Sequence, residues 1–208
     1  MNISFDNLPE DKKNKIIQSA LNEFAAKGYE RASTNVIVEN AEISKGLLFY
    51  YFKSKKGLYI FLLNYVIPIM YQKFYEYADM NITDFFERLK NWQVAKLTLF
   101  EKLPLETKFL IKAFTDIPKE LKNDILIIYS KYTQDGFRMI FDNIDYSNFR
   151  NDIDKQKAIN TIIWTLESYG NKYMKENLDE HGNLIIKKDV ILNDISDYIE
   201  ILKYGVKE

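Results

Sequence analysis

The sequence predicts an all-α fold, in which three short N-terminal helices are followed by a larger helical region. Only seven glycines and four prolines interrupt the 208 residues. Apolar residues recur every three or four positions through most of the chain, a period typical of helices rather than of strands. No internal repeat or low-complexity segment is present, so these helices are expected to pack around ordinary hydrophobic cores.

Composition excludes several classes of protein. No stretch approaches the ~20 apolar residues of a membrane span, and the first residues lack the pattern of a signal peptide. The chain has no cysteine, which excludes disulfides, thiol nucleophiles and zinc-thiolate sites and fits a reducing compartment. We therefore expect a cytoplasmic protein without a membrane partner.

The first three helices are expected at residues 9–27, from about residue 34 to residue 41, and at residues 45–52. The first carries an apolar stripe that starts after Pro9 and ends at Gly28. Ser33 or Thr34 caps the second helix, and Ser44 caps the third.

Longer helices are expected beyond residue 54, and Pro68 predicts a kink in the first of them. Their ranges are 55–78, 83–101, 105–116, 119–142, 155–178 and 189–204. A polar loop, 142–154, is expected between the helices at 119–142 and 155–178, and Tyr146 and Phe149 are its expected packing anchors.

The positive charge gathers near the third helix, although the net charge of the chain is −1. Residues 1–56 hold nine Lys or Arg against seven Asp or Glu, and four of these lysines are Lys45, Lys53, Lys55 and Lys56. Cations in the first turn of a helix oppose the helix dipole. Their presence after Ser44 and Ser54 indicates an anionic partner such as a phosphate.

Projection of residues 45–52 onto a helix separates two faces. Leu48 and Phe52 point inward, whereas Leu47, Tyr50 and Tyr51 point outward, where a stable monomer gains nothing from exposing them. Two short helices separated by a tight turn fit a helix-turn-helix, and an ordinary helical hairpin is the alternative.

A DNA partner accounts for these outward residues together. Gly46 allows close approach to a phosphate or base edge, and the tyrosine hydroxyls can donate to phosphates. Lys45 extends toward the groove, where it can bind guanine or a phosphate, and Leu47 offers methyl groups to thymine.

The stretch T-N-V-I-V-E-N-A-E-I-S-K-G-L-L-F-Y-Y-F-K-S-K-K-G-L resembles the recognition region of the TetR family of bacterial transcriptional regulators. Glu42 stands where the family usually has glycine, and Leu47 and Phe49 also depart from its pattern. The resemblance implies a DNA-binding domain at residues 1–56. The DNA-contacting residues that it implies are Ser33, Thr34, Lys45, Gly46, Leu47, Phe49, Tyr50, Tyr51 and Lys55.

The resemblance also implies that residues 57–208 form a helical domain for effector binding and dimerisation. This region carries 24 of the 31 aromatic residues, which suits a hydrophobic or cationic organic effector. The candidates to line its pocket are Phe61, Tyr65, Trp92, Phe114, Tyr132 and Trp164, and ordinary core packing is the alternative for each.

The last two helices present broad apolar faces, for which a four-helix interface between two subunits is expected and burial within one subunit is the alternative. The interface residues are Ile159, Ile162, Ile163, Leu166, Tyr173, Ile191, Ile195, Tyr198, Ile199 and Leu202. A homodimer would place two recognition helices about 34–36 Å apart on a palindromic operator in double-stranded DNA.

The expected function is a ligand-responsive repressor that releases its operator when a small organic effector binds. We expect no catalytic residue, no cofactor and no metal site. His181 and the aspartates at 142, 145, 152 and 154 lie in polar loops that are typical of solvated surfaces. A helical small-molecule-binding protein or enzyme with a vestigial helix-turn-helix is one alternative, and a helical interaction module that does not bind DNA is another.

Overall fold

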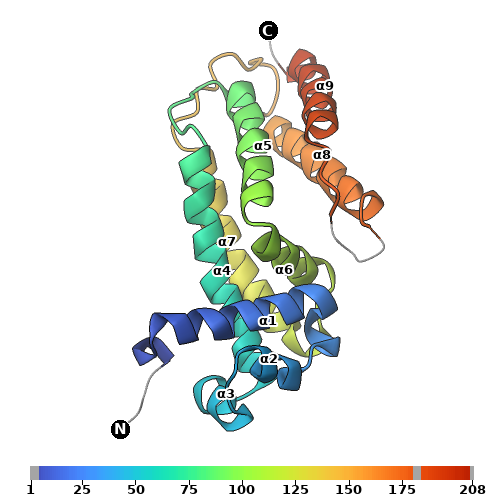
Figure 1. Ribbon diagram of the computed structural model, residues 1–208. Helices are drawn as coiled ribbons and strands as arrows, with labels where there is room; N and C mark the ends of the chain where they lie inside the picture. The colour runs from blue at the N-terminus through green and yellow to red at the C-terminus, as the bar shows by residue number, and fades with distance from the viewer. Residues whose placement is uncertain (1–4, 180–183, 207–208) are drawn as a thin grey trace. The chain divides into compact units, whose positions relative to one another are not determined.

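The computed structural model describes residues 5–179 and 184–206, without the side chains of residues 133–140 and 206. The described chain is helical, and its only extended pairings are two isolated bridges (Figure 1). The elements are η1 Phe5–Asn7, α1 Glu10–Arg31, α2 Thr34–Asn40, α3 Lys45–Phe52, α4 Lys55–Tyr77, α5 Phe85–Lys102, α6 Pro104–Thr115, η2 Lys119–Leu121, α7 Lys122–Ile140, α8 Lys155–Glu176 and α9 Lys188–Val206.

The all-α prediction is confirmed, and the helix bounds agree with the expected ranges to within a few residues. Gly28 interrupts α1 with a φ of 70°, and one further helical turn follows it. A glycine at this position adopts a positive φ without the steric cost that a side chain would add. At Pro68, where a kink was expected, α4 continues as one helix.

The helices form two compact units. The first comprises residues 1–72 and 103–136, and the second comprises residues 73–102 and 137–208. Because α4 contributes residues to both units, this grouping differs from the sequence-based boundary at residues 56 and 57, which stays a prediction.

The first unit has a core built around α1, which packs against α2 and α6. Its fully buried side chains come from each of the helices around it. They include Ile16, Ala20 and Phe24 of α1, Ile37 of α2, Leu48 of α3, Leu58 and Leu62 of α4, Phe109 of α6 and Ile125 of α7. The stripe predicted for the first helix is therefore the surface on which the short helices α2 and α3 are held.

The second unit packs α5 against α9, and α9 against α8 (Figure 1). Phe149, in the loop before α8, is 2 % exposed and contacts the rings of Phe85 and Phe86, and Tyr146 contacts Phe149. Both predicted anchors of this polar loop are confirmed.

Among the described side chains of the second unit, Arg88 is the most deeply buried cation, with 1 % of its surface exposed. Its Nε donates to the carbonyl oxygen of Ile82 at 2.6 Å, and one terminal nitrogen donates to that of Met80 at 2.8 Å. The guanidinium thereby satisfies backbone acceptors in the connection between α4 and α5.

None of the helices in the described ranges is long and apolar enough to cross a bilayer.

Candidate nucleic-acid interface and interior cavity

The start of α2 is held by α1. The carboxylate of Glu23, which is 7 % exposed, accepts a hydrogen bond of 2.9 Å from the Ser33 backbone N–H. Ser33 occupies the N-cap position as predicted, but its own hydroxyl makes no capping bond. The buried carboxylate thus takes over the orienting role at this helix start.

The turn between α2 and α3 contains Glu42, which has a φ of 54°. Departure from glycine here is compensated by an ion pair, because Glu42 Oε2 lies 2.5 Å from the Nζ of Lys15 on α1. This hydrogen bond and the charge of Lys15 lower the pKa of Glu42. The left-handed backbone that a tight helix-turn-helix requires is therefore present without the usual glycine.

Helix α3 has the two faces that its projection predicts. The Oγ of Ser44 accepts from the Leu47 N–H at 3.2 Å and caps the helix. Leu48 and Phe52 are 1 % and 7 % exposed, whereas Tyr50 is 43 % exposed. The fold therefore anchors α3 by one side and leaves the other side accessible.

The four lysines near α3 have different surroundings. Lys56 Nζ lies 2.7 Å from Asp124 of α7. Lys55 Nζ donates to the Glu30 carbonyl oxygen at 3.0 Å and lies over the Tyr29 ring. The fold itself thus supplies the negative partners for both lysines at the start of α4, and Lys55 is occupied at the negative end of α1.

Lys45 and Lys53 have no acidic side chain within 4.0 Å among the described residues. The ammonium of Lys45 lies over the ring of Phe49, and that of Lys53 lies over the ring of Tyr50 and donates to its carbonyl oxygen. Both lysines are exposed. They are the cations of this region that remain available to an external anion.

The ring of Tyr51 packs against Phe5, near the N-terminus. The ring of Phe5 in η1 makes edge contacts with Tyr51 and Phe61, and it also contacts Phe52. This cluster was not predicted, since nothing in the spacing relates residue 5 to residue 51. Phe61, a candidate pocket residue, therefore packs against Phe5 and against Phe52 of α3.

The turn between α3 and α4 brings two backbones close together. Lys53 has a φ of 65°, and the Ser54 hydroxyl accepts from the Gly57 N–H at 3.0 Å. A Cβ added to Gly57 would lie 2.0 Å from the Phe52 carbonyl oxygen. Glycine at residue 57 is thus a steric requirement for the end of α3.

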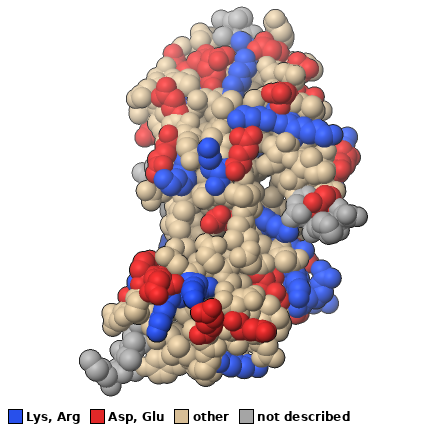
Figure 2. All heavy atoms as spheres, in the orientation of Figure 1, with Lys and Arg blue, Asp and Glu red and all other residues tan. Residues whose placement is uncertain are grey.

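The surface charge elsewhere is mixed. On the face drawn in Figure 2, basic and acidic side chains are interspersed rather than gathered into a single field. This face therefore offers no broad basic field to an anionic partner.

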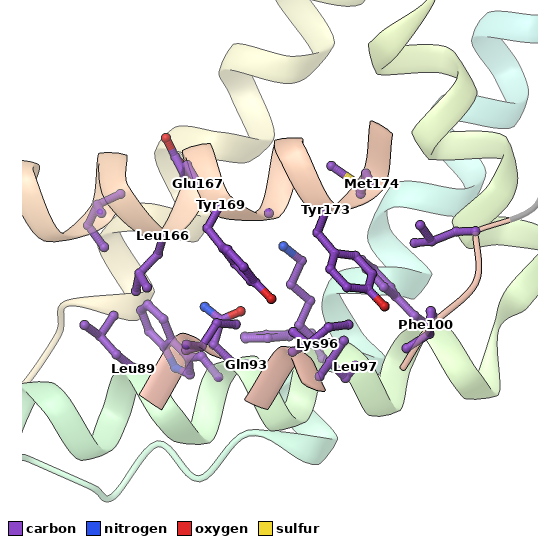
Figure 3. Close-up of a pocket in the computed structure, with 18 residues that line it drawn as sticks. Leu89, Gln93, Lys96, Leu97, Phe100, Leu166, Glu167, Tyr169, Tyr173 and Met174 are labelled. Atoms are coloured by element: carbon purple, nitrogen blue, oxygen red, sulfur yellow. The ribbon is translucent and has the colours of Figure 1, made fainter. Parts of the chain in front are cut away.

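The second unit contains a partly open cavity of about 280 Å³ between α5, α8 and α9 (Figure 3). Trp92, one of the six candidate pocket residues, is among the residues that line it. The other five candidate pocket residues, Phe61, Tyr65, Phe114, Tyr132 and Trp164, do not line it. Trp164 is instead 64 % exposed on α8.

The residues expected at a subunit interface fall into two groups. Five line the cavity: Ile163, Leu166, Tyr173, Ile191 and Ile195. Ile162 and Ile199 are fully buried within the unit, Ile159 and Leu202 pack against its core, and Tyr198 is 40 % exposed. Most of this apolar face is thus covered by the chain itself.

A different set of side chains forms the outer face of α8 and α9. Large exposed residues on this face are Trp164, Val190, Tyr198, Ile201 and Tyr204. Trp164, Val190 and Tyr198 line a surface groove between the two helices, and helical spacing puts Ile201 and Tyr204 on the same side of α9 as Val190. Sequence analysis missed Ile201 and Tyr204 because the apolar positions of α9 surround the helix, and periodicity does not say which side is covered.

The loop aspartates have structural partners. The Asp145 carboxylate accepts from the Ser147 N–H, and Asp152 pairs with Arg150. Asp154 caps α8 by accepting from the Lys157 N–H. His181 lies outside the described residues, and within the described ranges no group of acidic or histidine side chains has the arrangement of a metal site.

Comparison with known proteins relates both parts of the chain to regulators. The family model for bacterial regulatory proteins of the tetR family matches residues 16–60, and that for the tetracyclin repressor-like C-terminal domain matches residues 83–207. An uncharacterized HTH-type transcriptional regulator of Bacillus subtilis (strain 168), YuxN, is 43 % identical over 56 residues. That match covers 27 % of this chain and 19 % of YuxN.

Solved structures show the same fold at low sequence identity. A TetR family transcriptional regulator from Chloroflexus aurantiacus J-10-FL is 24 % identical, with a TM-score of 0.66 over 98 % of this chain and 97 % of the other. A TetR-like regulator from Rhodococcus sp. RHA1 is 15 % identical, with a TM-score of 0.69 over 95 % and 99 %. SmeT, the repressor of a multidrug efflux pump of Stenotrophomonas maltophilia, is 13 % identical, with a TM-score of 0.61 over 96 % and 93 %.

Proposed function

Because the chain belongs to the TetR family of bacterial transcriptional regulators, we propose that it is a homodimeric repressor that binds operator DNA and responds to a small organic effector. The single observation that carries the DNA-binding part is the construction of α3. Its buried side is fixed by Leu48 and Phe52, while Lys45 and Tyr50 remain exposed beside a capped helix start.

Each of the expected DNA-contacting residues has a role in this proposal. Lys45 and Lys53 contact phosphates or base edges, because no acidic side chain of the described chain neutralises them. Gly46 is exposed at the helix start and lets the backbone approach the DNA. Leu47, Phe49, Tyr50 and Tyr51 fill the groove, and Ser33 and Thr34 reach the backbone from α2. Lys55 has a supporting role, since it binds the end of α1.

Dimerisation supplies the second recognition helix. We assign the interface to the outer face of α8 and α9, where Trp164, Tyr198 and Ile201 are exposed. An isologous contact of this kind produces a two-fold dimer, which reads a palindromic operator with half-sites one helical turn apart.

Effector binding in the cavity would shift the population of dimer conformations away from those that fit two adjacent major grooves. Repression in the absence of effector and release in its presence then follow from one equilibrium. Operator DNA lies in the bacterial cytoplasm, which is where the proposed regulator acts.

The test is a titration of the purified protein with DNA from its own promoter region at 50 and 200 mM salt. We expect specific binding by two subunits per site and a steep loss of affinity at the higher salt, because phosphate contacts release counterions. The double variant Lys45→Ala, Tyr50→Ala should lose specific binding, and its salt slope should fall by about 0.9 for each phosphate contact removed.

Lys155→Ala is the matched control, since Lys155 is also exposed and also follows a capped helix start. It should bind DNA like the wild type. Equal affinity of the wild type for promoter and random DNA, or salt-insensitive association, would contradict the proposed function. A turnover screen with candidate substrates would then test an enzyme with a vestigial helix-turn-helix.

A further inference from the structure

The cavity in the second unit is lined mainly by apolar and aromatic side chains, and most of its polar groups are already occupied. The Tyr169 hydroxyl donates to Asp194 at 2.7 Å. The Tyr173 hydroxyl donates to the Ile185 carbonyl oxygen and accepts from the Lys187 N–H. Neither tyrosine is therefore free to serve as the main polar contact of a ligand.

Two donors in the cavity lack such partners. The side chain of Trp92 is only 7 % exposed, and its buried indole Nε1 has no hydrogen-bond acceptor. Lys96 projects between α5 and α8 with its ammonium directed toward the space beside Tyr169 and Tyr173 (Figure 3). No carboxylate of the described residues lies within 4.0 Å of it, and it lies over the Phe100 ring, 5.7 Å from the ring centroid.

An ammonium in this position is energetically unfavourable. The Lys96 side chain is exposed where the cavity opens, and its ammonium lies among the apolar and aromatic residues that line the cavity. Desolvation lowers the pKa of Lys96, and the charge of Glu167 opposes this shift only partly. A buried N–H without an acceptor carries a further cost. A ligand that brings a negatively charged acceptor would relieve both.

We propose that this cavity binds an organic anion with an apolar body, such as a medium-chain or aromatic carboxylate. The carboxylate would accept from Lys96 and, after a shift of the buried indole, from Trp92. Gln93 lines the same space and offers an amide. Leu97, Phe100 and Ile191 would surround the apolar part. The assignment rests on the proposed function, since it names the effector class for that regulator.

The size of the cavity limits the ligand. At about 280 Å³ it is about twice the roughly 150 Å³ of a cavity that holds benzene. A ligand of about a dozen non-hydrogen atoms fits this space. The sequence favoured a hydrophobic or cationic effector because the region is rich in aromatic residues, but the position of Lys96 disfavours a cation.

Isothermal titration calorimetry with three probes of equal chain length tests the charge preference. Decanoate, decan-1-ol and decyltrimethylammonium share the apolar body and differ in the head group. We expect decanoate to bind most tightly to the wild-type protein. Lys96→Met should weaken decanoate binding by about 10- to 100-fold and leave the affinity for decan-1-ol within about threefold.

Two further variants guard against a loss of binding through misfolding. Trp92→Phe removes the indole N–H together with part of the ring system. Loss of the N–H should weaken decanoate binding more than decan-1-ol binding, whereas the lost volume affects both. Lys102→Met removes an exposed lysine of the same helix and should leave all three affinities unchanged. Circular dichroism of each variant checks the helical fold.

Equal or tighter binding of decan-1-ol or decyltrimethylammonium would overturn the inference, as would the absence of binding by all three probes. The promoter titration is independent of these outcomes. Operator binding without decanoate binding would remove only the inference about the effector, whereas decanoate binding without operator binding would remove the proposed regulator and keep the anion site.

Discussion

At the scale of single residues, Gly57 shows how a backbone contact restricts the sequence. Its missing Cβ would lie 2.0 Å from the Phe52 carbonyl oxygen. We therefore expect Gly57→Ala to lower the free energy of unfolding by on the order of 1–3 kcal/mol, although alanine is otherwise the better helix former. The measurement is the midpoint of urea unfolding at constant m-value.

Gly170→Ala is the matched control, because Gly170 also lies within a helix and a Cβ there would meet no atom within 4 Å. It should raise the free energy of unfolding by about 0.5–1 kcal/mol. A neutral or stabilising effect of Gly57→Ala would contradict the close approach at the end of α3.

Lys96 leads to a prediction about pH. Its pKa is lower in the folded protein than in the unfolded chain, so between these two pKa values the unfolded chain binds more protons and stability rises with pH. Lys96→Met removes this dependence and the cost of the buried charge. We expect the variant to be more stable than the wild type at pH 7, by a margin that shrinks as the pH rises through the folded-state pKa.

Urea unfolding of both proteins between pH 7 and pH 10 measures that margin. The other titratable groups that line this cavity are Glu167, Tyr169 and Tyr173. Both proteins retain them, and the hydrogen bond to Asp194 and burial raise the pKa of Tyr169. A margin that is constant or grows with pH would show that Lys96 is fully solvated.

Inward and outward positions of α3 could be predicted from the sequence, because a period of 3.6 residues fixes the relative directions of Leu48, Phe52 and Tyr50. The partners of the neighbouring lysines could not. Lys55 binds the end of α1 and Lys56 binds α7, and neither contact has a signal in local spacing. Lysines near a helix start therefore predict a negative partner, but not whether that partner belongs to the protein itself or to a ligand.

At the scale of elements, Arg88 holds the connection before α5 in place. Its nitrogens donate to the carbonyl oxygens of Met80 and Ile82. Arg88→Met keeps apolar volume but leaves these buried acceptors without their donor. We expect the free energy of unfolding to fall by about 2–4 kcal/mol, since each lost partner costs about 1–3 kcal/mol.

Lys102→Met, at the exposed end of the same helix, should change the free energy of unfolding by less than about 0.5 kcal/mol. Thermal unfolding followed by circular dichroism compares the two variants. A similar small effect of Arg88→Met would mean that water replaces the guanidinium and that the connection does not depend on it.

Helix positions were predictable along the whole chain, whereas the surroundings of each helix were not. Capping residues such as Ser44 and Asp154 mark the starts of helices locally, and Gly28 marks an interruption within α1. Which side of α8 and α9 is covered depends on α5, which lies far away in the sequence and packs against α9. All of the residues first expected at a subunit interface except Tyr198 line the cavity or pack in the core, and the interface itself stays a prediction.

At the scale of the whole molecule, recognition of a palindrome requires two copies of α3. The outer face of α8 and α9 leaves Ile201 and Trp164 exposed at 68 % and 64 %, which is unfavourable for an isolated chain. Trp164→Glu, Ile201→Glu places two like charges on this face. We expect the variant to be monomeric in analytical ultracentrifugation and to bind operator DNA at least about tenfold more weakly, because each half-site is then bound separately.

Ile127→Glu provides the control for added charge. Ile127 on α7 is also 68 % exposed but lies outside the assigned face, so this variant should remain dimeric and bind the operator normally. If Ile127→Glu is monomeric while the double variant Trp164→Glu, Ile201→Glu remains dimeric, the interface lies on α7 and not on α8 and α9. Each outcome identifies one exposed apolar face as the surface that pairs the recognition helices.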